Sequence, residues 1–145
     1  MRDINLIVIH CSATESGVDY SVNDVRLWHK KRGFRDIGYH FLIHLDGRIE
    51  RGRPWDQAGA HAKGYNNNSI GICYVGGLKD WKPADTRTVA QIYSLRAAVE
   101  MLKAQYPMIE VVGHRDLSVD LNGDGMISES EWMKSCPCFS VKDEL

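Results

Sequence analysis

Short, continuous apolar runs, separated by segments with helical spacing, are the feature that most constrains the fold of this chain. Residues 6–9 (LIVI), 69–75 (SIGICYV) and 109–112 are such runs, and they are typical of sheet strands covered on both faces. Asp46-Gly47 separates two strand-like arms, and both turn positions of a tight hairpin favour positive φ. With two helices, the order is β-α-β-β-β-α-β, followed by a C-terminal segment that contains candidate metal-binding residues. The sequence therefore predicts an α/β fold, with a central mixed β-sheet flanked by helices.

Two segments carry the signals with which helices begin. Ser21 with Asp24 fits a capping box, Gly33 ends that segment, and Thr88 with Gln91 fits a second capping box. In the second segment, apolar residues recur three and four positions apart, which is typical of an amphipathic helix. The residues that we expect on its buried side are Ile92, Leu95, Val99, Leu102 and Tyr106. The aromatic side chains that we expect in the core are Trp28 and Tyr93.

Size and charge limit the partners of this chain. Its 145 residues suit one domain, residues 1–145, and we expect a monomer. With 18 basic and 19 acidic residues the net charge is -1, which gives no reason to expect nucleic acid or an anionic membrane as partner. The apolar run near the N-terminus is too short for a signal peptide or a membrane span. We therefore expect a protein that is cytoplasmic as synthesised, and we interpret the C-terminal KDEL as a coincidence.

Two histidines and a cysteine form a candidate zinc site. His10 and His114 each follow a predicted strand, and sites in α/β sheets gather at the carboxyl ends of strands. Cys136 precedes Pro137, which holds it in an extended conformation. Two imidazoles and one thiolate would leave a fourth tetrahedral position for water, as in catalytic zinc sites. From the spacing alone, Cys138 competes with Cys136 as the third ligand.

Five sequence blocks resemble one family when they are taken together. The blocks IVIHCSAT, GYHFLIHLDGRIERGR, HAKGYNNNSIGICYVGG, GHRDLS and KSCPCF occur in this order over nearly the whole chain. They resemble the zinc-dependent N-acetylmuramoyl-L-alanine amidases, type 2, of the phage-lysozyme and peptidoglycan-recognition-protein fold. The resemblance implies that zinc is bound by His10, His114 and Cys136, which favours Cys136 over Cys138. It also implies catalytic roles for Tyr39 and Lys134.

The resemblance implies hydrolysis of the amide between the lactyl group of N-acetylmuramic acid and L-alanine, in peptidoglycan or a muropeptide. Lys134 would stabilise the oxyanion, and Tyr39 would either orient the water or pass a proton to the leaving amine. His61 and Asn68 are candidates for substrate binding, and a surface position is the alternative for His61. The histidines that we interpret as structural or solvated are His29, His40 and His44.

A calcium-loop pattern interrupts the candidate zinc site. Residues 120–131 satisfy D-x-[DN]-x-[DN]-G-x5-E in full, inside an insertion over residues 119–135. Because no entering helix and no paired loop is predicted, we expect a structural Ca²⁺ and not a sensor. We hypothesise that calcium braces the segment that carries Lys134 and Cys136. The expected ligands are Asp120, Asn122, Asp124, Met126 (through its carbonyl), Ser128 and Glu131.

The predicted function is cell-wall lysis by a zinc amidase, as in a phage or prophage endolysin that acts on the wall after release. Three alternatives are open, of which two are not enzymes. The first is a non-catalytic peptidoglycan-binding module, which the complete set of ligands argues against. The second is an amidase that recycles wall fragments in the cytosol, and the third is an interaction module built on the calcium loop.

Overall fold

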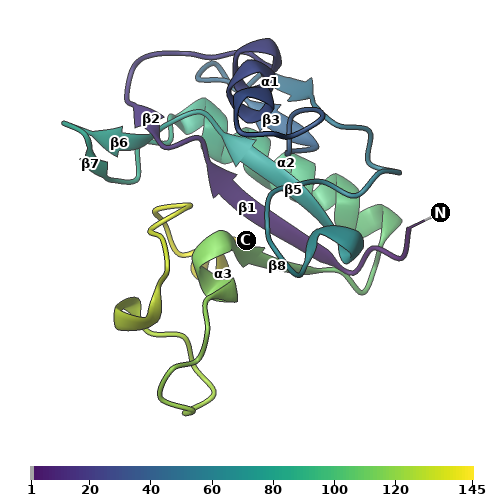
Figure 1. The fold of residues 1–145 in the computed structure, drawn as a ribbon, viewed down its shortest axis with the longest axis vertical. Helices are drawn as coiled ribbons and strands as arrows, with labels where there is room; N and C mark the ends of the chain where they lie inside the picture. Colours follow the sequence, from purple (N-terminus) through teal and green to yellow (C-terminus); the bar gives the residue numbers. More distant parts are fainter. Residues whose placement is uncertain (1) are drawn as a thin grey trace.

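A five-stranded mixed sheet runs through the molecule, as the computed structural model, which describes residues 2–145, shows in Figure 1. The strand order is β4-β3-β5-β1-β8, in which only the edge strand β4 is antiparallel to its neighbour. The predicted mixed sheet and the predicted hairpin at Asp46-Gly47 are thereby confirmed. The strands are β1 (Leu6–Cys11), β3 (Phe41–Ile43), β4 (Ile49–Arg51), β5 (Ser69–Tyr74) and β8 (Glu110–Gly113).

Two helices cover opposite faces of this sheet: α1 (Val22–Lys31) lies in front of it in Figure 1, and α2 (Val89–Gln105) lies behind. Both predicted capping boxes are present, with Ser21 and Thr88 as the N-cap residues. The prediction that Tyr93 lies in the core is wrong, because its side chain is 66% exposed. Tyr93 lies two positions before the buried Leu95 and therefore on the opposite side of α2.

Alternation along β1 decides which face carries the candidate site. Ile7 and Ile9 pack in the same core cluster as Leu95 of α2. Val8 belongs to a different cluster on the other face, and His10 shares that face because side chains alternate along a strand. His10 is therefore directed to the side of the sheet that α2 leaves open.

A second, small sheet was not predicted. It consists of β2 (Thr14–Glu15), β6 (Gly77–Lys79) and β7 (Lys82–Pro83), in the order β2-β6-β7. The turn between β6 and β7 has positive φ at Asp80 and Trp81, 51° and 62°. The Glu15 carboxylate accepts hydrogen bonds from their N–H groups at 2.7 and 2.9 Å, so the turn depends on a residue distant in sequence.

The C-terminal segment packs against the core again after the insertion over residues 119–135. A 3-10 turn (His114–Leu117) follows β8, and the insertion then extends below α3 (Val141–Glu144) in Figure 1. Phe139 and Val141 are buried in the α2-facing cluster. In the part of the chain that the structure describes, no helix is long and apolar enough to span a membrane.

Candidate active site and metal centre

The structure brings the three predicted zinc ligands together. His10 lies at the end of β1, and His114 directly follows β8, the parallel neighbour in which Gly113 pairs with Ile9. One donor atom from each of His10, His114 and Cys136 lies within 4.8 Å of the others. Nδ1 of His10 is 3.9 Å from Sγ of Cys136. Two nitrogens and one sulfur in such proximity are a donor set that suits zinc.

Electrostatics keep both imidazoles in the neutral form. His10 is only 1% exposed, and its burial, followed by the neighbouring His61, His114 and Lys134, lowers its pKa well below the ordinary value. Burial, followed by Lys134, also lowers the pKa of His114. A neutral imidazole has the free electron pair that a metal requires, so the residues present fit a zinc ion.

Cys136 is held by backbone contacts to the core of the domain. The Cys11 N–H donates to Sγ of Cys136 at 3.2 Å, and the Arg115 N–H donates to the Cys136 carbonyl at 2.9 Å. The buried Tyr74 hydroxyl donates to the Pro137 carbonyl at 2.6 Å. A Cβ at Gly113 would lie 2.8 Å from the Pro137 ring, so only glycine allows this approach. The Cys138 thiol instead donates to the carbonyl of Gly77 at 3.5 Å.

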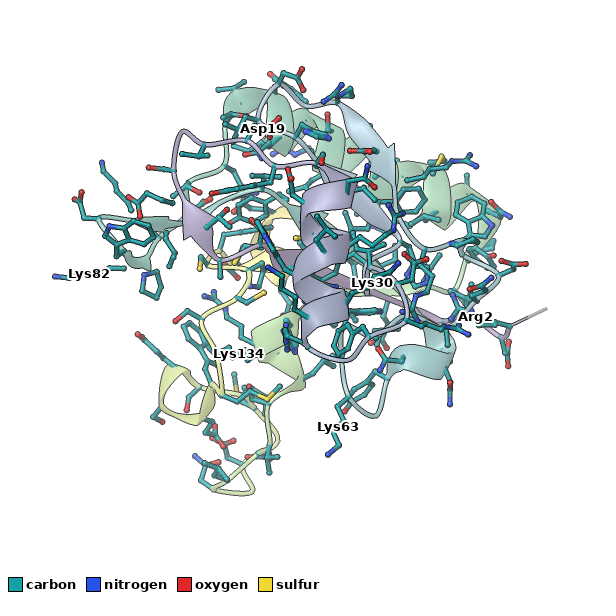
Figure 2. The ribbon with its side chains drawn as sticks, turned by 45° about the horizontal axis from the view of Figure 1, so that its top comes forward. Arg2, Asp19, Lys30, Lys63, Lys82 and Lys134 are labelled. Carbon is teal, nitrogen blue, oxygen red and sulfur yellow. The ribbon has the colours of Figure 1, made fainter. Side chains whose placement is uncertain are left out.

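Tyr39 and Lys134 line the same cleft, which has a volume of about 790 Å³. The Tyr39 ring lies 5.0 Å from that of His10, and burial raises the pKa of its hydroxyl well above the ordinary value. Lys134 is exposed on the C-terminal segment, between the insertion and the body of the molecule (Figure 2). The charged residues that line the cleft are Arg32, Lys63 and Lys134.

His61 and Asn68, the candidates for substrate binding, lie in different environments. The His61 ring lines the cleft, and its Nδ1 lies 2.9 Å from Nε2 of His10. Burial, followed by His40 and His114, lowers the pKa of His61 to about 3. Asn68 directly precedes β5, and its amide donates to the Asn5 side chain at 2.7 Å, at the opposite end of the strands from His10.

Asn66 lies in the cleft instead of Asn68. It is among the residues that line the cleft, and its side-chain oxygen accepts from the N–H groups of His61 and Ala62, both at 2.9 Å. Sequence reasoning missed it because the run Asn66-Asn67-Asn68 offers three equivalent residues. These three residues form a 3-10 helix, Asn66–Asn68, which is too short to give a periodic pattern in the sequence. The direction of each side chain could therefore not be predicted.

Of the two predicted roles, structural or solvated, burial and hydrogen bonding support the structural one for His29, His40 and His44, and His29 also lines the cleft. Nδ1 of His29 accepts from the Gly38 N–H at 2.8 Å. Nδ1 of His40 accepts from the Gly71 N–H at 3.0 Å, and its Nε2 lies 2.8 Å from the Gln57 carbonyl. The two ring nitrogens of His44 each lie 2.8 Å from a carboxylate oxygen, of Asp19 and of Glu50.

The insertion forms a compact acidic loop. One carboxylate oxygen from each of Asp120, Asp124 and Glu131 lies within 4.8 Å of the others. The Asp120 carboxylate accepts from the Gly123 and Gly125 N–H groups at 3.0 and 2.8 Å. The Ser128 N–H is the main cause that lowers the pKa of Glu131 to about 2. The remaining predicted ligands, Asn122, Met126 and Ser128, lie on the same loop and are exposed.

An α/β sheet that gathers two histidines and a cysteine at its carboxyl edge, in an open cleft, defines a class of protein suited to metal-assisted hydrolysis. The family model for N-acetylmuramoyl-L-alanine amidase matches residues 1–138. The endolysin of Klebsiella phage KP32 is 38% identical over 142 residues, 97% of this chain and 85% of the relative. The endolysin of Escherichia phage T7 is 40% identical over 137 residues, 94% of this chain and 82% of the relative.

A solved structure with the same fold is the N-acetylmuramoyl-L-alanine amidase LysC from Clostridium intestinale URNW. It aligns with a TM-score of 0.73 and 28% identity, and the alignment covers 96% of this chain and 79% of that one. The chain belongs to the N-acetylmuramoyl-L-alanine amidase family. Its activity is hydrolysis of the amide between N-acetylmuramic acid and the L-alanine of the stem peptide, which lyses the cell wall.

Proposed function

We propose that this amidase is zinc-dependent and that His10, His114 and Cys136 hold the ion. The observation that carries the proposal is the proximity of their three donor atoms, within 4.8 Å, at the edge of an open cleft. Three protein donors leave a fourth position open, which distinguishes catalytic from structural zinc sites. The site is built from one chain, and we propose that residues 1–145 act as one monomeric amidase domain.

Each residue beside the metal site then has a distinct task. Zinc, when bound, would polarise the lactyl carbonyl and lower the pKa of water in the site. The Lys134 ammonium, which is close enough to lower the pKa of His10 and His114, would donate to the oxyanion that develops on the lactyl oxygen. The Tyr39 hydroxyl, in the same cleft, would orient the attacking water or donate a proton to the leaving amine.

The charge of the cleft supports a substrate with carboxylates, such as the stem peptide of peptidoglycan. Its charged lining residues, Arg32, Lys63 and Lys134, are all cationic. Cations gathered at a cleft raise the local concentration of anionic ligands. Because the two phage relatives are endolysins, we propose that the enzyme is made in the cytoplasm and reaches the wall through a phage-type lesion.

We propose in addition that residues 120–131 bind a structural Ca²⁺. The full loop motif and the clustering of Asp120, Asp124 and Glu131 support this. The contacts that hold Cys136 to the core involve no residue of this loop. The hypothesis that calcium braces the segment with both Lys134 and Cys136 is therefore restricted to Lys134. Calcium would brace the exposed Lys134, three residues after Glu131, and not the third zinc ligand.

Purified sacculi test the proposed function directly. The wild type should release stem peptides that begin with L-alanine, as detected by mass spectrometry. His10→Ala should release none, because it loses a ligand. Lys134→Ala should retain zinc but release peptides about 10²–10³ times more slowly, the usual effect of removing an oxyanion donor.

Three results would contradict the proposal. Wild-type protein that folds but takes up no zinc would remove its basis. Equal peptide release by His10→Ala would show that the ligand set is not catalytic. Zinc-loaded wild type that sediments with sacculi and releases no peptide would instead identify the non-catalytic peptidoglycan-binding module.

A further inference from the structure

We propose that His61 is a positioning residue that fixes the tautomer and orientation of His10 through a hydrogen-bonded chain His10–His61–Ser69. The proposal rests on the zinc site proposed above, and it replaces the sequence-based expectation that His61 binds substrate. It assigns a role to a side chain that would touch neither the metal nor the scissile bond.

The geometry gives each ring nitrogen a separate partner. Nδ1 of His10 faces Sγ of Cys136 at 3.9 Å, and Nε2 of His10 faces Nδ1 of His61 at 2.9 Å. Nε2 of His61 in turn lies 3.2 Å from the hydroxyl oxygen of Ser69. The three side chains therefore form a line that leads away from the metal site into the fold.

Metal binding decides where the protons lie on this line. A metal among His10, His114 and Cys136 needs the electron pair of Nδ1 of His10, so the ring proton of His10 must be on Nε2. That N–H donates to Nδ1 of His61, which leaves the His61 proton on Nε2, facing Ser69. In the other tautomer of His10 the proton would occupy the nitrogen that faces Cys136, and the site could not close on a metal.

The fold reserves space for the His61 ring at this point. A Cβ at Gly71 of β5 would lie 2.7 Å from the ring, and a Cβ at Gly59 would lie equally close. The ring packs edge-on against His10, with an interplanar angle of 88°. Asn66 fixes the loop by accepting from the N–H groups of His61 and Ala62.

Both partners of His61 are buried, whereas His61 itself is half-buried at the wall of the cleft. His10 is 1% exposed and Ser69 is 0% exposed, so a truncated His61 would remove the side-chain acceptor that orients the Nε2–H of His10. Metal-binding histidines usually donate this proton to a carboxylate, a backbone carbonyl or water. A neutral imidazole in that place orients the ligand without adding negative charge, so the positive charge of the bound ion would be preserved.

Zinc affinity, measured by competition with a chromophoric chelator, tests the proposal independently of activity. His61→Ala should weaken zinc binding about 10–100-fold, the usual effect of losing such a partner. His61→Asn should restore affinity to within a few-fold of the wild type, because Oδ1 of asparagine and Nδ1 of histidine are both bonded to Cγ. His44→Gln replaces another buried, hydrogen-bonded histidine that does not line the cleft and should leave the affinity unchanged.

A second measurement avoids substitution altogether. The ¹⁵N chemical shifts of the imidazole nitrogens in the metal-free wild type should show the His10 proton on Nε2. A proton on Nδ1 of His10, unchanged zinc affinity in His61→Ala, or equally weak binding by His61→Ala and His61→Asn would each overturn the positioning role. Wild type that binds no zinc would instead refute the proposed function, so the two failures are distinguishable.

Discussion

At the scale of single residues, histidine serves two purposes in this protein. His10 and His114 supply candidate metal donors at the edge of the cleft, whereas His29 and His40 accept backbone N–H groups inside the fold. Burial is the main cause that lowers the pKa of His29 and of His40 to about 4 in each case. These two histidines are therefore neutral in the folded protein at pH values where the unfolded chain is already protonated.

Stability should therefore decrease in mild acid. The folded state binds fewer protons than the unfolded state between about pH 4 and the unfolded pKa of about 6.5, so the free energy of unfolding falls as the pH falls through this window. Each of the two histidines should lower the free energy of unfolding by up to about 2 kcal/mol at pH 5 relative to pH 7. Urea unfolding of the metal-free protein at both pH values measures the loss, which His40→Gln should reduce. Equal stability at pH 5 and pH 7 would contradict this account.

The sequence predicted the residues whose position follows from a regular element. His10 and His114 directly follow strand patterns, and the N-caps Ser21 and Thr88 have local signatures. It did not predict the partner of His61, because the path of the loop over Gly71 depends on tertiary contacts that no periodicity encodes. For the same reason it could not separate Asn66 from Asn68.

At the scale of elements, the insertion differs from the rest of the domain in how it is held. Ser118 and Met133 close its base, where the Met133 N–H donates to the Ser118 hydroxyl at 3.1 Å. The Arg115 guanidinium stacks on the Trp132 ring at 3.8 Å. Beyond this base the loop is largely exposed, and its own carboxylates and N–H groups supply most of its contacts.

Glu131→Gln tests the proposed calcium site. If calcium orders the segment that carries Lys134, this variant should have a lower kcat than the wild type at micromolar calcium and recover partly at millimolar calcium, with unchanged zinc affinity. Glu129→Gln changes a neighbouring glutamate at a position that supplies no ligand in the motif and should behave like the wild type. A decrease in kcat that millimolar calcium does not reverse would show that Glu131 only accepts hydrogen bonds within the loop. An unchanged kcat at every calcium concentration would contradict the proposed calcium site.

The elements themselves were predictable to the extent that they are long or buried. β1, β5 and β8 are apolar throughout or flanked by clear breaks, and they were found in the predicted order. The two-residue strands β2 and β7 were missed because they are too short for any alternation to be visible. The turn between β6 and β7 depends on Glu15, more than sixty positions away, a contact that a local pattern cannot reveal.

At the scale of the whole molecule, the C-terminal segment belongs both to the core and to the site. Phe139 and Val141 pack in the α2-facing cluster. Cys136 precedes them by a few residues. The hydrogen bond from the Tyr74 hydroxyl to the Pro137 carbonyl is made between the candidate zinc ligand Cys136 and these core residues. Packing of the core therefore helps to position the proposed third zinc ligand.

Tyr74→Phe should reveal this connection. The substitution leaves the buried Pro137 carbonyl without its donor, which should lower the free energy of unfolding by about 1–3 kcal/mol and weaken zinc binding several-fold. Tyr93→Phe removes the same hydroxyl from an exposed tyrosine of α2 and should change neither quantity. Identical unfolding energies and zinc affinities for the two variants would contradict the connection.

The position of these residues after the sheet strands and both long helices has a consequence for biosynthesis. Because residues 136–141 complete both the apolar interior and the set of donors, a nascent chain that stalls before them has neither a finished fold nor a finished catalytic centre. Translation that stops before residue 136 would therefore yield inert fragments for proteolysis, and hydrolytic activity would arise only after residues 136–141 have left the ribosome.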